Sequence, residues 1–419
     1  MIKKDKAILV GLDLLTNKIS ASESLDELAG LAHAISIDTV YQVIQRSDKV
    51  YPKYYVGSGK VLEIKNLIDI YEATMVIFDD PLSPSQIKNL ERTLDIQVID
   101  RSFLILSIFA ERATSKRSKL EVSLAQKEYM LPRLVGLGLS LSRQGGGTYN
   151  AKGPGETKLE LDRRKLLDEI SQIKHDLKVI SKEIDISRSK RIKNKIPIVS
   201  LVGYTNVGKS SLMNSLSKRL SPNNDEVFEK DMLFATLDTK TKRMKKDNYP
   251  PFLLTDTVGF IRKLPKELLR SFESTLKDVL GADLIVLVAD GANYKDYQIS
   301  ETIKILDAIG ASQIPRLITL TKSEIAEEIP YLNDDYIFVS NVTGDNIDEL
   351  INAIYGHIYL DSKIVTLKIP YSSASIFEDI KTNSTIINTN YYENGYLLKV
   401  ILPNHLYLKY QGYLKTNEH

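Results

Sequence analysis

The stretch "GYTNVGKSS", residues 203–211, has residue types and a spacing that could hold a phosphate. Gly203 and Gly208 are separated by four residues, and Lys209 and Ser210 follow. Such a loop points backbone N–H groups at an anion on a helix N-terminus, with the lysine on the β- and γ-phosphates and the hydroxyl on Mg²⁺. The pattern therefore predicts a P-loop rather than an ordinary glycine turn. The predicted nucleotide contacts are Gly203, Tyr204, Thr205, Asn206, Val207, Gly208, Lys209, Ser210 and Ser211.

Two later segments are predicted to recognise a γ-phosphate. "DTVG" at 256–259 ends a β-like run, which suits Asp256 for orienting the Mg²⁺ shell and the Gly259 N–H for the γ-phosphate. In the preceding "LFATLDT", Thr236 is predicted to close onto Mg²⁺ and the γ-phosphate, with Phe234 beside it. The candidate catalytic residues are Lys209, Asn206, Thr236 and Gly259, and the candidate metal ligands are Ser210 and Thr236.

The residue after "DTVG" is Phe260, where many GTPases carry the glutamine that positions the attacking water. Phenylalanine has no acceptor, so the isolated chain is expected to hydrolyse slowly unless another group supplies the missing function. Asn206, the fourth residue of the loop, offers one route. Its side-chain oxygen could hold K⁺ near the phosphates, in the place of an arginine finger. The alternative is that Asn206 only turns the loop, and the sequence leaves both interpretations open.

The segment "TKSE" is the candidate for base recognition, in the place where guanine is usually read by Asn-Lys-x-Asp. Lys322 can lie on the purine face, and the Glu324 carboxylate can accept from two guanine N–H groups, whereas adenine would present a lone pair. Thr321 is shorter than asparagine and is expected to tie this segment to the P-loop less firmly. In "SNV", after the next strand, the Asn341 N–H is predicted to meet the guanine oxygen, so GTP is the predicted nucleotide. The predicted guanine site comprises Thr321, Lys322, Glu324, Ser340, Asn341 and Val342.

Composition excludes several other classes of site. The chain has 419 residues, enough for about two to four domains, no cysteine and five scattered histidines. Disulfide frameworks and zinc sites built from thiolates are therefore excluded. The longest apolar run, at 284–289, is too short for a membrane span, and Asp13 interrupts the N-terminal apolar stretch, so no signal peptide is predicted. A cytoplasmic protein is expected, without a DNA partner and monomeric in solution.

Charge is distributed unevenly along the chain. Residues 101–200 contain 21 Lys and Arg against 11 Asp and Glu, a net charge of +10 within a total of +2. Two helix candidates lie there, at 103–130 and 156–190, and the second has apolar residues at heptad spacing. They are predicted to form an antiparallel coiled-coil hairpin, joined by "LPRLVGLGLSLSRQGGGTYNAKGPGETK". A long glycine-rich connection with basic residues favours contact with RNA, although a solvated helical face is the alternative.

The surrounding elements predict a multidomain α/β fold. Strand-like runs "KAILVGL", "TVYQVIQ", "TMVIFDD" and "DIQVID" alternate with helices and indicate an N-terminal parallel α/β unit. Five further strands, "IPIVSLVG", "PFLLTDTVGF", "DLIVLVAD", "RLITLTK" and "YIFVS", predict a doubly wound P-loop domain. A strand, a helix and two strands follow position 360, indicating a small α+β domain. The expected domains are 1–102, 103–195, 196–358 and 359–419.

Taken together, these segments resemble the HflX GTPases, within the translation-factor-related GTPases, over nearly the whole chain. The most specific segment is "KLEVSLAQKEYMLPRLVGLGLSLSRQGGGTYNAKGPGETKLELDRR"; "GSGKVLEI", "FDDPLSPSQIKNLE", "VIDRSFLILSIFAERA", "GYTNVGKSSLMN", "LFATLD" and "DTVGF" agree. The resemblance implies Mg²⁺ and GTP or GDP as ligands, and the large ribosomal subunit and its RNA as partners. It further implies help in splitting stalled or stressed ribosomes, and hydrolysis that the ribosome stimulates.

The chain departs from the family pattern in two places. "TKSE" replaces Asn-Lys-x-Asp, which bears on guanine affinity but not on the phosphates, and Thr239 stands where the family usually has proline. Three other functions stay open: an antibiotic-protection factor with low turnover, a K⁺-dependent GTPase acting on tRNA, and ATP-dependent RNA remodelling through the N-terminal domain. For the last, "GSGK" at 57–60 lacks the full loop spacing, and Ser58 is interpreted first as a helix N-cap.

Overall fold

The computed structural model of the chain describes residues 5–15, 20–141, 154–194, 196–221, 240–245, 249–257, 259–263 and 279–415. These residues divide into two compact units. Of the described residues, unit 1 contains those up to Lys182 and residues 261–263, and unit 2 contains the remainder. The boundary therefore passes between Phe260 and Ile261, directly after the "DTVGF" segment.

Unit 1 contains a four-stranded sheet with the strand order β2-β1-β3-β4, in which all neighbouring strands are parallel. The strands β1 and β3 are buried along most of their length, which fits their continuous apolar runs. This confirms the parallel α/β unit. Chain order reverses between β1 and β3, where ligands of open α/β sheets usually bind. The strands are β1 (Lys6–Leu14), β2 (Asp38–Ser47), β3 (Met75–Phe78) and β4 (Gln97–Asp100).

Side chains fix where the helices of unit 1 begin. Ser20 caps α1, and Ser83 caps α3 in a capping box with Gln86. The cap of α2 is Gly57 and not Ser58, so the predicted role of Ser58 is wrong. Gly57 takes the extended backbone conformation of a cap, and Ser58 is already the first helical residue. The helices are α1 (Ala21–Ala34), α2 (Ser58–Tyr71), α3 (Pro84–Leu94) and α4 (Arg101–Arg112).

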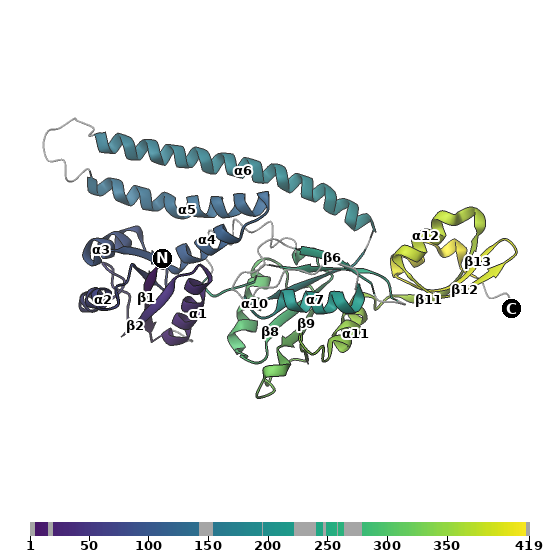
Figure 1. The fold of residues 1–419 in the computed structure, drawn as a ribbon. Helices are drawn as coiled ribbons and strands as arrows, with labels where there is room; N and C mark the ends of the chain where they lie inside the picture. Colours follow the sequence, from purple (N-terminus) through teal and green to yellow (C-terminus); the bar gives the residue numbers. More distant parts are fainter. Residues whose placement is uncertain are drawn as a thin grey trace, which may run out of the picture. The chain divides into compact units, whose positions relative to one another are not determined.

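Two long helices, α5 (Lys116–Leu141) and α6 (Pro154–Asn194), run side by side in Figure 1. Leu124 of α5 forms an apolar cluster with Ile170 and Ile173 of α6. Ion pairs at 2.5 and 2.8 Å also join the two helices. Apolar packing is therefore sufficient to explain the heptad positions.

The predicted helix boundaries in this region need correction. The candidate helix over 103–130 is interrupted, because α4 ends at Arg112 and the Ser115 hydroxyl accepts from the Ser118 N–H at the start of α5. The predicted irregular connection starts too early, since α5 continues as a helix through Pro132 to Leu141. The glycine-rich residues 142–153 lie outside the described residues.

Unit 2 is built around a six-stranded sheet with the order β10-β9-β8-β5-β7-β6. All five predicted strands are present and parallel, which confirms the doubly wound P-loop fold. The sixth strand, β6, was not predicted. It is an antiparallel edge strand, and its charged residues Lys240, Lys242 and Arg243 are typical of sheet edges. The strands are β5 (Ile198–Gly203), β6 (Lys240–Met244), β7 (Phe252–Asp256), β8 (Leu284–Asp290), β9 (Arg316–Thr321) and β10 (Tyr336–Phe338).

The helices α7 (Lys209–Leu220), α10 (Asp296–Ala308) and α11 (Ile347–Ile358) contribute apolar side chains to one core with this sheet. The strand β5 is central and leads directly into the loop before α7. The predicted phosphate loop therefore lies at the carboxyl end of a central strand, as it does in other doubly wound nucleotide-binding domains.

After α11 the chain forms an antiparallel three-stranded sheet with the order β11-β13-β12. Its apolar residues form a core of their own with α12 and α13. The elements are β11 (Lys363–Pro370), α12 (Ala374–Asn383), β12 (Thr385–Tyr392), β13 (Gly395–Leu402) and α13 (Asn404–Lys409).

Candidate nucleotide-binding site

The loop between β5 and α7 has the backbone that a phosphate cradle requires. Gly208, which precedes the first residue of α7, has φ +84°, a left-handed conformation that glycine adopts readily. Asn206 is also left-handed, with φ 62°, and asparagine tolerates this region better than most residues. The turn-forming role of Asn206 thus has a physical basis, and its side chain is exposed to solvent.

Lys209 is the buried cation of the loop. Its Nζ donates to the carbonyl oxygens of Gly203 at 3.1 Å and Tyr204 at 2.6 Å, and the residue is 7% exposed. Burial lowers the pKa of Lys209 to about 8, although the nearby charge of Asp256 acts in the opposite direction. An ammonium held by carbonyl dipoles in a dry setting is well suited to pair with phosphate oxygens.

Ser210 and Asp256 lie together at the ends of neighbouring elements. The Ser210 hydroxyl donates to the Asp256 carboxylate at 2.7 Å, and Asp256 ends the buried strand β7. A hydroxyl beside a carboxylate at the start of a phosphate-binding helix fits Mg²⁺, a hard cation that prefers oxygen ligands. When bound there, Mg²⁺ would neutralise phosphate charge. Ser210 would hold the ion, and Asp256 would orient its shell.

The "DTVGF" segment contacts the phosphate loop through backbone atoms. The Phe260 N–H donates to the Gly203 carbonyl at 3.0 Å, and the Phe260 carbonyl accepts from the Thr205 N–H at 2.8 Å. A Cβ on Gly259 would lie 2.9 Å from Lys209 Nζ and 2.8 Å from the Thr205 Cα. Only glycine fits so close to the lysine, which accounts for its presence in the motif.

The base-recognition segment is joined to the phosphate loop by side chains. The Thr321 hydroxyl donates to the Val207 carbonyl at 2.7 Å and is fully buried. The Asn341 side-chain amide donates to the Gly208 carbonyl at 3.3 Å. Threonine, although shorter than asparagine, therefore makes the connection, and Asn341 adds a second one.

Lys322 and Glu324 differ in their surroundings. Lys322 Nζ forms an ion pair with Asp290 at 2.7 Å, and its backbone is left-handed with φ 64°. The other oxygen of Asp290 accepts from the N–H groups of Ala292 and Asn293. Glu324 lies in a short 3-10 turn and is exposed to solvent. A solvent-exposed carboxylate at this position could approach the edge of a base.

Most of the predicted site residues lie in the loops at one edge of this sheet. Ser340 is buried, and its hydroxyl accepts from the N–H groups of Val342 and Thr343, which shapes the turn after β10. The Val342 side chain is 81% exposed. Phe234 and Thr236 lie outside the described residues.

Sequence reasoning missed two contributors to this site. Asp290, which holds Lys322, ends strand β8, and a carboxylate at that end of a buried strand was the available signal. The backbone pairing of Phe260 with the phosphate loop could not be found from side-chain types, because only main-chain atoms take part.

This domain belongs to the class of P-loop nucleoside triphosphatases. It has the glycine loop before a helix, the buried ammonium of Lys209 and the carboxylate of Asp256 at a strand end. Comparison with known families agrees. Residues 22–110 match the model "GTP-binding GTPase N-terminal" and residues 112–191 match "GTP-binding GTPase Middle Region". Residues 198–322 match the model "50S ribosome-binding GTPase".

The relatives specify the class further. The chain is 38% identical over 397 residues to GTPase HflX of Caldanaerobacter subterraneus subsp. tengcongensis, covering 94% of this chain and 90% of the relative. It is also 38% identical over 375 residues to GTPase HflX of Escherichia coli (strain K12), covering 87% and 86%. The chain belongs to the HflX family of GTPases, binds guanine nucleotide and hydrolyses GTP.

One similar solved structure is a GTP-binding protein from the archaeon Sulfolobus solfataricus in complex with GDP. It is 24% identical, with 85% of this chain and 100% of the other covered and a TM-score of 0.40. Across the residues that the structure describes here, no helix is both long enough and apolar enough to span a membrane.

Proposed function

We propose that this GTPase binds the large ribosomal subunit in its GTP form and splits or rescues stalled ribosomes, with hydrolysis stimulated by the ribosome. The observation that carries the proposal is the match of residues 198–322 to a model described as a 50S ribosome-binding GTPase. The resemblance of the whole chain to GTPase HflX supports it, because the match extends well beyond the nucleotide-binding domain.

Charge supports RNA as the contacted component. The net charge of +10 over residues 101–200 favours a polyanion, and phosphate contacts dominate the affinity of proteins for nucleic acids. We assign this role to the hairpin of α5 and α6, with the glycine-rich residues 142–153 as the part that approaches ribosomal RNA. The division into domains 1–102, 103–195, 196–358 and 359–419 belongs to the same proposal.

The site also suggests how GTP is held. Lys209, Gly259 and Thr236 would contact the γ-phosphate, Ser210 and Thr236 would hold Mg²⁺, and Lys322 and Glu324 would contact guanine. K⁺ held by Asn206 would supply the cationic charge that Phe260 cannot provide. Hydrolysis rates in K⁺ and Na⁺, with Asn206→Ala as the control, test this: equal rates in both salts would remove the ion from the proposal.

Co-sedimentation with separated ribosomal subunits tests the main proposal. Binding to the large subunit should be strong with a non-hydrolysable GTP analogue and weak with GDP or ATP. Large subunits should also accelerate GTP hydrolysis. Binding that is identical in every nucleotide state, or absent, would contradict the proposal.

The same measurements separate the remaining functions. Occupancy of ribosomes without faster hydrolysis favours the antibiotic-protection factor, and K⁺-dependent hydrolysis without any response to ribosomes favours the enzyme acting on tRNA. RNA-stimulated ATP hydrolysis that survives Lys209→Ala would favour RNA remodelling through the N-terminal domain.

A loop replacement tests the RNA contact. Residues 142–153 would be exchanged for a Gly-Ser linker of the same length, so that α5 and α6 remain connected. We expect weaker binding to the large subunit and an unchanged affinity for GDP. If subunit binding keeps its full strength, RNA is contacted elsewhere on the chain.

A further inference from the structure

The three-stranded sheet that follows α11 has two faces of different character. Apolar side chains on one face, among them Leu367, Leu398 and Val400, pack with Ile380 of α12 into a buried core. In Figure 1, α12 lies on one side of these strands. Because side chains alternate along a strand, the residues between the core positions point to the opposite side of the sheet. The sheet therefore has one covered face and one open face.

The open face carries basic and amide side chains. It is formed by residues paired across β11, β13 and β12: Thr366, Lys399 and Asn388 in one row, Lys368, Leu397 and Asn390 in the next, and Pro370, Gly395 and Tyr392 in the third. Both lysines and both asparagines among them are exposed to solvent. None of the residues in these rows is acidic. The open face thus presents positive charge without a competing carboxylate in its rows.

An open hollow of about 510 Å³ lies against this face, lined among others by Thr366, Asn388, Asn390, Leu397 and Lys399. Lys415 also lines the hollow, and its backbone N–H donates to the Thr366 carbonyl at 2.9 Å. Across the described residues, neither Lys399 nor Lys415 forms an ion pair, whereas Lys409 of the same domain is paired with Asp379 at 2.8 Å. Two lysine charges beside the hollow are therefore available to an anionic ligand.

An aromatic ring lies at one end of the open face. A Cβ on Gly395 would lie 2.5 Å from the Tyr392 hydroxyl oxygen and 2.8 Å from its Cζ, so the tyrosine side chain crosses the neighbouring strand at this glycine. Lys368 Nζ lies 4.8 Å from the centre of the same ring. An aromatic ring next to a cation can receive a stacked base together with the phosphate of its nucleotide.

This combination of side chains matches the chemistry of a single polynucleotide strand. Lysines contact phosphates, and asparagine amides carry both donors and acceptors for the edges of bases. Base edges and base faces are accessible in unpaired strands, and in other RNA-binding domains aromatic residues on an open sheet stack two or three bases. An acidic protein surface would match the lysines, but it requires neither the ring nor the amides.

We propose that the open face of this C-terminal sheet binds single-stranded RNA, with its lysines on phosphates, Tyr392 stacked on a base and its two asparagines on base edges. The face lies outside the ranges matched by the family models, which end at residue 322, and it is distinct in sequence from the α5–α6 hairpin. The choice of RNA rests on the proposed association with ribosomes. The preference for an unpaired strand comes from the face itself.

Fluorescence anisotropy with a labelled single-stranded RNA of about ten nucleotides tests the proposal. It is measured on the full chain and on the chain with residues 142–153 replaced by the Gly-Ser linker, in which the other proposed RNA contact is weakened. Tyr392→Leu should weaken binding about tenfold, because a stacked base is lost. Lys399→Gln and Lys415→Gln should each reduce the steepness of the dependence of log K on log salt by about 0.7, the effect of one phosphate contact to a single strand.

Lys381→Gln is the matched control, because it removes an exposed lysine of the same domain from α12, the helix on the covered face. It should leave the affinity and the salt dependence unchanged. Lys399→Arg keeps the charge and should bind RNA as the parent does. Far-ultraviolet circular dichroism spectra should be the same for all variants, since each change is made at the surface.

Several results would overturn the proposal. One is that the changes on the open face leave both affinity and salt dependence at the parent values, and another is that Lys381→Gln alters them equally. A double-stranded RNA of the same length that binds as tightly would contradict the preference for an unpaired strand. A poly-glutamate peptide of the same charge that binds as tightly would make an acidic protein the partner instead.

Ultraviolet crosslinking of the same RNA to the full parent chain locates the contact directly. Mass spectrometry of the digested complex should find RNA attached to the peptide that contains Tyr392. Crosslinks confined to the α5–α6 hairpin would contradict the proposal. None of these measurements uses ribosomes, so their outcome is separate from that of the co-sedimentation test.

Discussion

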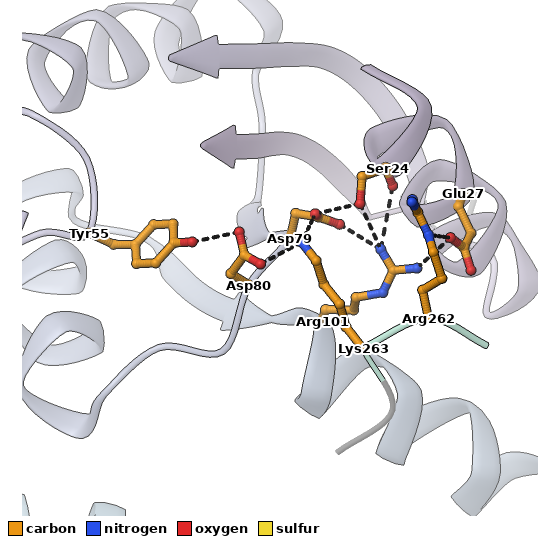
Figure 2. Close-up of polar contacts among 8 residues, drawn as sticks. All are labelled: Ser24, Glu27, Tyr55, Asp79, Asp80, Arg101, Arg262 and Lys263. Atoms are coloured by element: carbon orange, nitrogen blue, oxygen red, sulfur yellow. Dashed lines mark hydrogen bonds and ion pairs between the residues drawn. The ribbon is translucent and has the colours of Figure 1, made fainter. Parts of the chain in front are cut away.

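Each of the two units contains an open sheet of mainly parallel strands and a buried cation near the carboxyl ends of those strands, and the two cations are held in opposite ways. Lys209 in unit 2 is held mainly by the carbonyl oxygens of Gly203 and Tyr204. Arg101 in unit 1 is held by the carboxylates of Asp79 and Glu27 (Figure 2). Carbonyl dipoles leave the lysine's charge available to a phosphate, whereas carboxylates neutralise the arginine.

The comparison indicates that the shared sheet architecture does not decide which unit binds nucleotide. In unit 2, a left-handed Gly208 leads directly into a twelve-residue helix, an arrangement that lets N–H groups and the lysine bind the same anion. In unit 1, the corresponding edge carries acidic side chains at the ends of β3 and β4. Those carboxylates are paired with cations of the chain itself, which favours a structural role for this edge.

The largest effect should come from removing Arg101, the cation that carboxylates neutralise, and it should be on the stability of unit 1. Arg101→Met leaves two carboxylates short of a buried partner, and breaking a buried ion pair in this way costs about 3–5 kcal/mol. Hydrogen exchange of the β1 and β3 amides should accelerate accordingly, while GDP still binds. Arg164→Met, at a solvent-exposed arginine 4.0 Å from Glu160, is the matched control and should be almost silent. Unaltered exchange in Arg101→Met would remove the contrast between the units.

Removing Lys209, the cation that is available to a phosphate, should instead affect the rate of GTP hydrolysis. Lys209→Ala is expected to slow GTP hydrolysis by about 10²–10³-fold, the usual effect of losing one donor to developing charge. The fold should survive, because no carboxylate depends on Lys209 in the way that Asp79 depends on Arg101. Single-turnover hydrolysis, together with the far-ultraviolet circular dichroism spectrum, measures both properties. Loss of the folded spectrum would show that Lys209 is structural as well.

The pH dependence of stability should distinguish the two cations further. Burial lowers the pKa of Lys209 to about 8, and the pKa of an unfolded lysine is about 10.4. Between these values the unfolded chain binds more protons, so this group makes stability rise with pH. Below pH 8 both states are protonated, and the buried charge carries its full cost. Lys209→Met should therefore be more stable than the parent near pH 7, by of order 1–3 kcal/mol, with the difference shrinking toward pH 10.

Urea unfolding of the parent, Lys209→Met and Arg101→Met across this pH range measures the effect. The Arg101→Met difference should stay flat, because a guanidinium does not titrate there. If the stability difference between Lys209→Met and the parent also stays constant with pH, the Lys209 ammonium of the parent is better solvated than its contacts indicate.

The two regions differ in how well the sequence predicts them, because one depends on local spacing and the other on contacts between distant residues. The phosphate loop was predictable because its glycines, lysine and serine stand at fixed spacing within eight residues. The ion pairs around Arg101 were not, because Glu27, Asp79, Arg101 and Arg262 come from segments up to 235 residues apart. Acidic residues at strand ends gave a hint, but nothing local indicates which cation will reach them.

The sequence also predicted the pairing of helices better than the residues at which they begin and end. Heptad spacing indicated that α5 and α6 would pack together, yet it could not place the interruption between Arg112 and Lys116, where Ser115 caps the next helix. Glycines at 136 and 138 suggested a loop, whereas the chain continues as a helix to Leu141. Tertiary context can override weak intrinsic propensity, which single-sequence reasoning does not include.

The smallest expected effect concerns how each unit ties its loops together. Unit 1 uses charged pairs at Arg262 and Lys263, whereas unit 2 joins its base-recognition segment to the phosphate loop with the neutral hydrogen bond from Thr321 to the Val207 carbonyl. Thr321→Val keeps the shape of the side chain but leaves that carbonyl without its donor, at a cost of about 1 kcal/mol, or about fivefold in GDP affinity. Thr321→Ser keeps the hydroxyl and should bind GDP nearly as well as the parent, which makes it the matched control. Equal GDP affinities for Thr321→Val and the parent would mean that the loops of unit 2 are positioned by their backbone alone. The two units would then differ in the kind of interaction that positions their loops, and not only in its strength.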